Sequence, residues 1–582
     1  MVLTNEQRKA INCDRHTLLV ACPGSGKTHT LAAKLINCLD EVRGTPRKIA
    51  CITYTNPAVY EIEDRLKTYG STGDEDFCDI STIHSFCLTN ILQNFYWYIP
   101  EYRKGFKVLP PDSEKYRKIV EAICAEYSIP IQFRDYFESL GREPDGSPVV
   151  MPEIGPDAAK AFWDRLLQEG FIDFANIIYY TYRLISKSPE ITNAIACKYA
   201  WFLVDEFQDT SALQVEILKQ IAGRKITKFF LVGDPYQSIY GFAGARPELM
   251  NDFASFLGAE QDFKLLANFR SSRPVICHAE KLCPRDPPMI AQGKSAHFTE
   301  EPKYIHCRNA FEAITDYFIP ALDENKISYG ESAILAPWWV ALLRLGRQLR
   351  EFGIPIIGPG ARPYRRIHLF AMLAEQICAY IEQPDSKVFY NIERELFLLI
   401  SNTTGSTDFR VYSYAGRVVV RRLINCGIEL KERCQNGIVW LREAVDRFSE
   451  ILIKEEFITA DESKLIKESV TGMELDMKGN IDTANLSVSD LGMYANSDRS
   501  MKLLTMHRAK GREFDAVAII DLHEGRVPHF SAITQDRIDE SRRLLYVSIT
   551  RARRLLMYIT DTENPRNTPS RFLASEGLDL LS

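Results

Sequence analysis

Residues 18–28 read LLVACPGSGKT, and this stretch decides what fold to expect. Its first four residues are apolar and predict a short buried strand, while Leu31, Leu35 and Ile36 follow at helical spacing. A glycine-containing turn between a strand and a helix points backbone N–H groups at a phosphate, and the helix N-terminus adds partial positive charge. The stretch therefore predicts a nucleoside triphosphate site, formed by Ala21, Cys22, Pro23, Gly24, Ser25, Gly26, Lys27, Thr28 and His29.

Three residues in and before this loop have predicted roles in binding the nucleotide. We expect Lys27 to reach the β- and γ-phosphates of the nucleotide and Thr28 to offer its hydroxyl to Mg²⁺. Upstream, the amide of Gln7 can donate to and accept from the edge of an adenine, although an ordinary surface glutamine is the alternative. Ala21 stands where the usual pattern begins with glycine.

Length and composition limit the class of protein. The chain has 582 residues, 46% of them hydrophobic and 25% charged, which is typical of a globular protein with about three to five folding units. The fourteen cysteines include no CxxC pair, and there is no run of eighteen apolar residues. We therefore expect a cytoplasmic protein that does not enter a membrane. The net charge of −6 does not favour a nucleic-acid binder, although a local basic track can lie within an acidic total.

Further strands end in residues that suit phosphoryl chemistry. Ala200–Val204 is followed by Asp205 and Glu206, which we expect to hold Mg²⁺ and to deprotonate the attacking water, respectively. An exposed acidic turn is the alternative. Gln237 follows strand Lys228–Val232 and is a candidate sensor of the γ-phosphate, and Arg270 is a candidate to stabilise charge on the transferring phosphoryl group.

Aromatic and polar residues after the strands are candidates for binding a single nucleic-acid strand. Tyr54 follows strand Lys48–Thr53, and His84 follows strand Asp79–Ile83. Tyr240 and Phe242 in DPYQSIYGFAGA are candidates to stack on bases. Ordinary core or loop roles are the alternative for Tyr54 and His84 taken alone.

The later part of the chain predicts a second α/β half. The expected strands are Tyr304–Cys307, Ser332–Ala336, Ile354–Gly358, Lys502–Met506, Ala516–Asp521 and Leu555–Thr560. The basic run before the last strand predicts a solvated helix face for Arg553 and Arg554.

Taken in order, these pieces resemble the motifs of the UvrD/Rep-type superfamily 1 DNA helicases. ACPGSGKT is similar to motif I, ITYTNPAVYEIEDRL to Ia, STIHSF to Ib and LVDEFQDT to II. LVGDPYQSIYGFAGA is similar to motif III, NFRSS to IV, LLTMHRAKGREFDAV to V and RRLLYVSITRAR to VI. The segment from Gln7 is similar to the adenine-reading Q motif.

The resemblance implies an α/β fold of two RecA-like P-loop domains, each a parallel sheet flanked by helices and carrying a helical insertion. The implied layout is domain 1A at 1–90 and 197–275, insertion 1B at 91–196, domain 2A at 276–384 and 498–575, a reduced 2B-like insertion at 385–497, and a tail at 576–582. It implies ATP hydrolysis that drives movement 3′ to 5′ on single-stranded DNA, with single-stranded or tailed double-stranded DNA as substrate.

The resemblance also implies roles for particular residues. Gln237 would be the γ-phosphate sensor, Arg270 and Arg551 the arginine fingers, and Glu513 a contact to the ribose. Phe269 replaces the usual tyrosine that stacks on adenine, and His29 replaces an arginine after GKT. The implied DNA contacts are Tyr54, His84, Phe242, Thr505 and His507.

Departures from the family pattern suggest a specialised member. Pro57 stands in place of a lysine in motif Ia, and Phe242 and Ala243 in place of Trp-Arg in motif III, which should weaken contacts to DNA. Together with the short 2B-like segment, these changes resemble the helicases of Gabija-type antiphage systems, which act beside a separate OLD-family nuclease. DNA repair is the other expected pathway. A DNA-stimulated ATPase sensor that regulates a partner nuclease is the alternative function.

Overall fold

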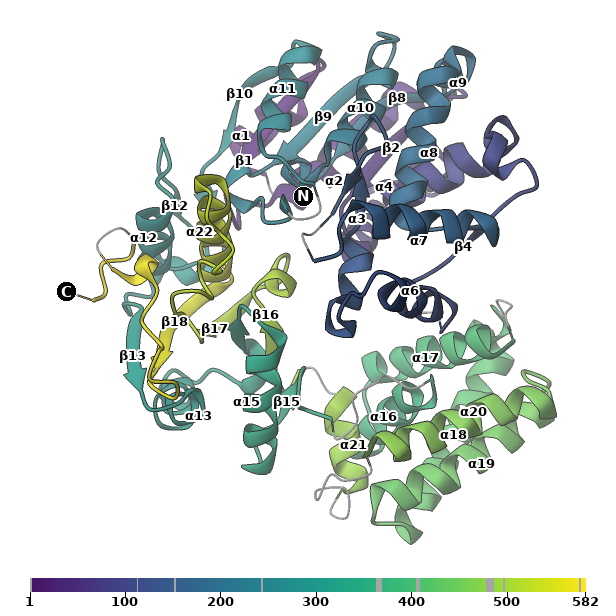
Figure 1. The fold of residues 1–582 in the computed structure, drawn as a ribbon, viewed down its shortest axis with the longest axis vertical. Coiled ribbons are helices and arrows are strands. Elements are labelled where there is room, and N and C mark those ends of the chain that lie inside the picture. The colour runs from purple at the N-terminus through teal and green to yellow at the C-terminus, as the bar shows by residue number, and fades with distance from the viewer. Residues whose placement is uncertain are drawn as a thin grey trace. The chain divides into compact units, whose positions relative to one another are not determined.

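The computed structural model describes residues 3–111, 114–150, 153–241, 244–362, 369–404, 409–477, 486–495, 498–574 and 577–581. The chain forms two compact units, one of Met1–Thr299 with Ala532–Thr550 and one of Glu300–Ser531 with Arg551–Ser582. Each unit has its own six-stranded sheet flanked by helices (Figure 1). None of the helices in the described ranges is long and apolar enough to span a bilayer.

The sheet of the first unit is parallel throughout. Its order is β10 (Glu260–Leu265), β1 (Thr17–Ala21), β9 (Lys228–Gly233), β8 (Tyr199–Val204), β2 (Lys48–Thr53) and β3 (Cys78–Thr82). Successive side chains point to opposite faces, so Leu18 and Phe202 enter one core while Leu19 and Leu203 enter the other. Helices cover both faces, which explains why the central strands are continuously apolar.

One face of this sheet is covered by α1 (Asn5–Ile11), α2 (Lys27–Val42) and α3 (Asn56–Tyr69). The other face is covered by α8 (Phe174–Lys187), α9 (Pro189–Lys198), α10 (Ala212–Ala222) and α11 (Glu248–Leu257). The structure differs here from the expected insertion at 91–196, because apolar residues of α8 and α9 belong to the core of the sheet. A separate small core is formed around α6 (Glu114–Glu126) and α7 (Pro156–Gln168).

Short elements complete the first unit. Three two-stranded sheets pair β4 (Lys107–Val108) with β7 (Phe171–Ile172), β5 (Gly141–Arg142) with β6 (Pro148–Val149), and β11 (Ala267–Asn268) with β12 (Ile290–Ala291). The remaining helices include α4 (Ile83–Phe86), α5 (Gln93–Phe95), α12 (Arg273–Leu282) and α22 (Gln535–Ile549). Contacts place α12 and α22 in the first unit, whereas the expected boundary after residue 275 divided α12 and gave α22 to the second domain.

The sheet of the second unit is also parallel. Its order is β13 (Lys303–Cys307), β18 (Ala552–Asp561), β17 (Phe514–Ile519), β14 (Ser332–Ala336), β16 (Met501–Thr505) and β15 (Ile356–Ile357). The flanking helices include α13 (Ala310–Ala313), α14 (Ile319–Glu324) and α15 (Trp339–Glu351). The expected helix face for Arg553 and Arg554 is wrong, because both lie on β18, where Arg553 pairs with the acids Glu331, Glu513 and Asp515.

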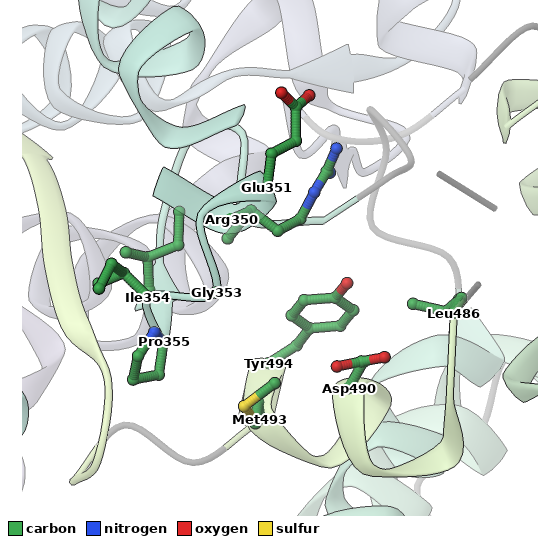
Figure 2. A pocket seen from close by; sticks show the side chains of 11 residues that line it. Arg350, Glu351, Gly353, Ile354, Pro355, Leu486, Asp490, Met493 and Tyr494 are labelled. Carbon is green, nitrogen blue, oxygen red and sulfur yellow. The ribbon is translucent and has the colours of Figure 1, made fainter. Parts of the chain in front are cut away.

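Six helices of the second unit form an insertion with its own core. They are α16 (Leu369–Glu382), α17 (Ser386–Thr404), α18 (Tyr414–Arg433), α19 (Gly437–Lys454), α20 (Ala460–Met477) and α21 (Val488–Ala495). The insertion therefore begins with α16, before the boundary expected at residue 385. Where it joins the sheet, a cavity of about 210 Å³ lies between Arg350 and Pro355 on one side and Met493 and Tyr494 on the other (Figure 2).

The predicted fold class is confirmed: two α/β units with parallel sheets, flanked by helices and carrying helical insertions. The expected strands lie within a few residues of the observed ones, and Ser332–Ala336 and Lys48–Thr53 coincide with β14 and β2. The sequence did not predict β10, which forms one edge of the first sheet.

Candidate nucleotide and DNA site

The predicted phosphate loop lies between β1 and α2, as expected. Gly24 and Gly26 both have left-handed backbone conformations, with φ of 67° and 79°, which favour glycine at these two positions. The Ser25 hydroxyl donates to the Cys22 carbonyl at 2.7 Å and closes the turn. A Cβ atom at Gly24 would lie 2.6 Å from Cβ of Arg270, so this glycine also permits the motif IV segment to approach the loop.

Gln7 is buried and connects α1 to the phosphate loop. Its Oε1 accepts from the backbone N–H of Thr4 at 2.8 Å, completing a capping box, and its Nε2 donates to the Ser25 carbonyl at 3.1 Å. An amide has two donor hydrogens and two acceptor lone pairs. These two bonds leave one donor and one acceptor of the amide for a base. Because Gln7 is buried, the alternative of an exposed surface glutamine is wrong.

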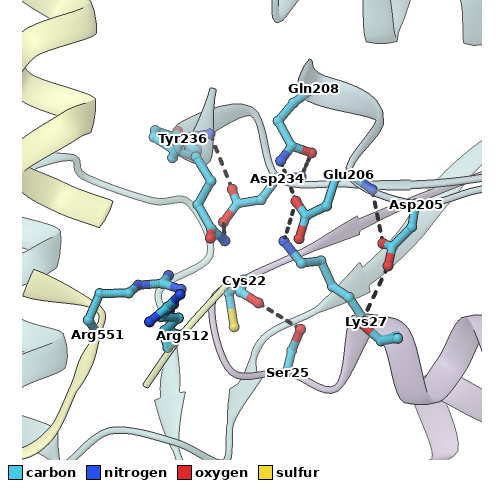
Figure 3. A network of polar contacts seen from close by, with 12 residues as sticks. Cys22, Ser25, Lys27, Asp205, Glu206, Gln208, Asp234, Tyr236, Arg512 and Arg551 are labelled. Atoms are coloured by element: carbon cyan, nitrogen blue, oxygen red, sulfur yellow. Dashed lines mark hydrogen bonds and ion pairs between the residues drawn. The ribbon is translucent and has the colours of Figure 1, made fainter. Parts of the chain in front are cut away.

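The two acidic residues after β8 face the start of α2 (Figure 3). The Thr28 hydroxyl lies 3.3 Å from Oδ2 of Asp205, and Nζ of Lys27 lies 3.1 Å from Oε2 of Glu206. Glu206 has a left-handed backbone conformation with φ of 48°, unusual for a residue with a side chain. This turn directs two successive carboxylates at the phosphate loop, so they do not form an exposed acidic turn.

Burial gives these groups unusual proton affinities. Burial, and then the neighbouring Glu206 carboxylate, raise the pKa of Asp205 to about 7. Burial alone would lower the pKa of the Lys27 ammonium, but the carboxylates of Glu206, Asp234 and Asp205 outweigh it and raise that pKa. The site therefore keeps Lys27 charged, and a cation beside Asp205 would favour the ionised form of that carboxylate.

Gln208 and Asp234 link these acids to Gln237. Nε2 of Gln208 donates to Glu206, and its Oε1 accepts from the backbone N–H of Asp234 at 2.9 Å (Figure 3). The Asp234 carboxylate in turn accepts from Nε2 of Gln237 at 2.6 Å. A continuous chain of hydrogen bonds thus runs from the carboxylate at the end of β8 to the predicted γ-phosphate sensor after β9.

Arg285 holds Asp234 from the opposite side. Its guanidinium forms an ion pair with Asp234 and donates to the hydroxyl of Tyr546 on α22 at 3.0 Å. The same guanidinium lies over the ring of Tyr236, 4.4 Å from its centroid. Sequence reasoning missed Gln208, Arg285 and Tyr546 as neighbours of the site, and it noticed Asp234 only as the end of a strand.

The helix α22 also contacts the backbone of the motif III loop after β9. Nε of Arg543 donates to the Ser238 carbonyl at 2.8 Å, and Oε1 of Glu540 accepts from the Gly241 N–H at 2.8 Å. A Cβ atom at Gly241 would lie 2.7 Å from that carboxylate oxygen, so a side chain there would force the Glu540 carboxylate to shift. One helix therefore holds the loop at two points.

The motif IV residues lie next to the phosphate loop. The Phe269 N–H donates to the Gly24 carbonyl at 2.9 Å, and Oδ1 of Asn268 accepts from the N–H groups of Arg270 and Ser271. Nη1 of Arg270 donates to the Thr550 carbonyl at 3.2 Å. The ring of Phe269 is exposed, as a residue that stacks on a base needs to be.

His29 lies on α2 immediately after the loop. Its Nδ1 contacts Nη1 of Arg65 on α3. The structure therefore places the guanidinium of Arg65 beside the position where the family pattern has arginine.

Two of the predicted DNA contacts lie against each other. The rings of Tyr54 and Tyr240 stack with centroids 5.2 Å apart and an interplanar angle of 21°. Tyr54 follows β2 and Tyr240 lies in the loop after β9, so residues far apart in sequence form one aromatic surface. Phe242 lies outside the described residues.

His84 makes an edge-to-face contact with Phe174, with ring centroids 5.7 Å apart. Burial lowers the pKa of His84 to about 4, so this imidazole is neutral at physiological pH. Phe174 begins α8 and is exposed. Sequence reasoning missed Phe174 because it lies 90 residues from His84 in a region without a recognisable motif.

The remaining predicted residues belong to the second unit. Thr505 ends β16, and burial lowers the pKa of nearby His507 to about 4. Glu513 accepts from Arg553 at 2.7 Å. The buried Arg551 donates to the Arg512 carbonyl at 3.2 Å.

Comparison with known proteins gives matches to two helicase domain families. The UvrD/REP helicase N-terminal domain matches residues 3–140 and 153–257, and the UvrD-like helicase C-terminal domain matches residues 386–563. Together the matched segments cover more than half of the chain. The chain belongs to the UvrD/Rep helicase family. This membership confirms the predicted family and enzyme class.

Individual members of the UvrD/Rep family match along almost the whole chain. The ATP-dependent DNA helicase PcrA of Bacillus subtilis is 24% identical over 658 aligned residues, which cover 99% of this chain and 86% of that protein. The ATP-dependent DNA helicase Rep of Escherichia coli is 25% identical, with 96% of this chain and 91% of that protein covered. DNA helicase II of Rickettsia typhi is 25% identical, with coverage of 98% and 94%.

Proposed function

We propose that this UvrD/Rep-family chain is an ATP-dependent DNA helicase that hydrolyses ATP to move 3′ to 5′ along single-stranded DNA. The observation that carries the proposal is the pairing of Lys27 with Glu206 and of Thr28 with Asp205 at the phosphate loop. These pairs bring together a cation for the phosphates, a carboxylate for the attacking water and oxygen ligands for a metal, where the start of α2 meets the end of β8.

Mg²⁺ fits the residues that are present. Thr28 and Asp205 offer a hydroxyl and a carboxylate, which are the hard oxygen ligands that Mg²⁺ prefers. The raised pKa of Asp205 indicates a site where a dication would stabilise the ionised carboxylate. When bound, the ion would neutralise charge on the phosphates.

The residues of the chain divide the chemistry among them. Glu206 accepts a proton from the attacking water, Gln237 contacts the γ-phosphate, and Arg270 and Arg551 stabilise charge on the transferring group. Gln7 and Phe269 bind the base, and Glu513 contacts the ribose. The aromatic pair Tyr54 and Tyr240 stacks on bases of the bound strand, together with His84, Phe242, Thr505 and His507.

The chain-specific motif III favours a second candidate function. Phe242 and Ala243 replace the usual Trp-Arg. The smaller ring and the lost cation should lower the affinity for single-stranded DNA, on which sustained unwinding depends. We therefore also propose a DNA-stimulated ATPase that senses DNA and regulates a separate nuclease of the OLD-family type, acting in antiphage defence or DNA repair in the cytoplasm.

The test is ATP hydrolysis by the purified chain with and without single-stranded DNA, beside unwinding of a 3′-tailed duplex. Stimulation with unwinding supports the helicase, whereas stimulation without unwinding supports the sensor. A duplex unwound only from a 5′ tail would contradict the polarity. Glu206→Gln should bind ATP normally and lose turnover, and hydrolysis at the wild-type rate would overturn the catalytic assignment.

A further inference from the structure

Lys34 is a lysine in the core of the first unit that has no part in the proposed chemistry. It lies on α2, the helix that begins with Lys27, and its side chain is 1% exposed. Lysine is almost never fully buried unless its ammonium has partners. Burial lowers the pKa of this ammonium, because the charged form loses its hydration. The groups that hold the ammonium in the core therefore indicate what Lys34 does.

The ammonium of Lys34 binds the C-terminal end of α1. Its Nζ donates to the Ile11 carbonyl at 2.9 Å and to the Cys13 carbonyl at 2.7 Å. An ammonium has three donor hydrogens, and Nζ also lies over the ring of Trp201, 4.1 Å from its centroid. The last carbonyls of a helix lack partners within the helix and carry partial negative charge. Lys34 therefore caps α1 with a cation from a neighbouring helix.

The opposite end of α1 carries Gln7, the residue proposed to bind the base. Nε2 of Gln7 donates to the Ser25 carbonyl, and Oε1 accepts from the Thr4 N–H, so the amide is held in one orientation. An adenine edge offers the N7 acceptor and the N6 amino donor, whereas the same edge of guanine offers two acceptors. An amide with one donor and one acceptor left in fixed positions matches adenine and not guanine.

The helix between these two ends is short. α1 has seven residues, and its buried residues are Gln7, Ala10 and Ile11. A helix of this length is not stable by itself in water. Its position therefore depends on what holds its ends, which are the phosphate loop at Gln7 and the Lys34 ammonium at Ile11.

We propose that Lys34 is a positioning residue for nucleotide recognition, because it holds α1 where the amide of Gln7 meets the adenine. Without the ammonium, the Ile11 and Cys13 carbonyls would lose their donor, and the end of α1 would shift until water reached them. The inference rests on the proposed function, since it takes Gln7 to bind the base. Lys34 acts through α1 and not through a contact of its own with the nucleotide.

The experiment measures binding of the non-hydrolysable β,γ-imido analogues of ATP and GTP to the full chain by calorimetry. The wild-type chain should bind the adenine nucleotide about tenfold more tightly, as expected of one or two hydrogen bonds. Lys34→Met keeps an unbranched side chain and removes the ammonium. We expect it to lower this preference about fivefold or more, through weaker binding of the adenine nucleotide.

Steady-state kinetics give a second measurement that a purely structural role would not reproduce. Lys34→Met should raise KM for ATP and leave kcat within about twofold of the wild-type value, because Lys34 does not touch the reacting groups. Hydrogen exchange of the amides in residues 5–13 should be faster in this variant. Val42→Ala, a buried position at the other end of α2, is the matched control and should change neither.

A double-mutant cycle shows whether Lys34 acts through Gln7. If it does, Lys34→Met should add nothing to the loss of adenine preference that Gln7→Ala causes. Lys34→Gln keeps a neutral donor in the core and should retain more of the preference than Lys34→Met. It also provides the comparison with the wild-type chain if Lys34→Met does not fold.

The inference is wrong if Lys34→Met keeps the wild-type preference, if it weakens binding of both nucleotides equally, or if its effect and that of Gln7→Ala are additive. A wild-type chain that binds the two nucleotides equally would also overturn it. Absence of ATP hydrolysis, with an adenine preference that depends on Lys34, would refute the proposed function and leave this inference standing.

Discussion

Asp234 and Arg285 form an ion pair that is almost fully withdrawn from solvent, with side-chain exposures of 0% and 6%. They lie 51 residues apart in sequence, one directly after β9 and the other just beyond α12. The pair contacts Gln237 on one side and Tyr546 of α22 on the other. One buried interaction thus joins the proposed phosphate sensor to the helix that carries motif VI.

Removing one partner of this pair should be strongly destabilising. Arg285→Met leaves the Asp234 carboxylate buried without its counter-ion, which typically costs about 3–5 kcal/mol. The double variant Asp234→Asn with Arg285→Met should recover part of that loss, because no isolated charge remains. Thermal unfolding of the four proteins in a double-mutant cycle measures the coupling, and additive effects would contradict it.

Binding of a divalent cation should depend on pH through Asp205. Its folded pKa of about 7 lies above the unfolded value of 3.8, so the folded chain holds a proton between these values and the group's contribution to stability falls as pH rises through that window. Below pH 7 the ionised fraction falls about tenfold per unit, and cation affinity should fall equally. Binding of Mn²⁺, followed by EPR from pH 8 to pH 5, measures this.

Asp205→Asn is the control for that titration. It should bind Mn²⁺ weakly and lose the pH dependence between pH 5 and pH 8. A wild-type affinity that stays constant from pH 7 to pH 5 would show that Asp205 is ionised throughout.

The contact of Glu540 with Gly241 should limit opening of the motif III loop. A hydrogen bond to a charged group is worth about 1.5–3 kcal/mol, so Glu540→Ala should speed exchange of the Gly241 amide about tenfold or more. Hydrogen exchange of a peptide covering 235–241 measures this. Glu540→Gln keeps an acceptor oxygen and should show a smaller effect, and equal rates in all three proteins would contradict the role.

The Tyr54–Tyr240 surface should contribute directly to affinity for single-stranded DNA. Tyr240→Ala should cost about 1–3 kcal/mol of binding, whereas Tyr240→Phe keeps the ring and should bind nearly as wild type. Anisotropy with a labelled oligo-dT measures both. Tyr60→Ala removes a tyrosine from α3 that is 63% exposed and is the matched control. Equal loss in the control would indicate a non-specific effect.

The sequence predicted elements whose residues carry their own local signal. Ser332–Ala336 and Lys48–Thr53 are apolar strands beside turns or polar termini, and both were located correctly. β10 was missed because four of its six residues, Glu260, Gln261, Asp262 and Lys264, are polar. An edge strand is partly exposed and needs no apolar run, so hydrophobic pattern alone does not reveal it.

The same reasoning explains which site residues were found. Lys27, Thr28, Asp205 and Glu206 lie in contiguous stretches whose chemistry can be read along the chain. Arg285 contacts Asp234, and Glu540 contacts the Gly241 N–H. Only the tertiary fold brings these partners together, so no spacing in the sequence predicts them. The predicted division of the chain placed α22 in the second domain, whereas it belongs to the first unit. The apolar pattern of a helix shows that one face is buried, but not which sheet buries it.

The ion pair between Lys27 and Glu206 has a consequence for the order of events at the phosphate loop. The ammonium that is expected to bind the phosphates also pairs with the carboxylate that is expected to activate water. A polyphosphate bound to Lys27 would compete with Glu206 for that ammonium, while the hydrogen bond from Gln208 to Glu206 would remain. We therefore expect phosphate binding and release of the proposed base from Lys27 to be coupled.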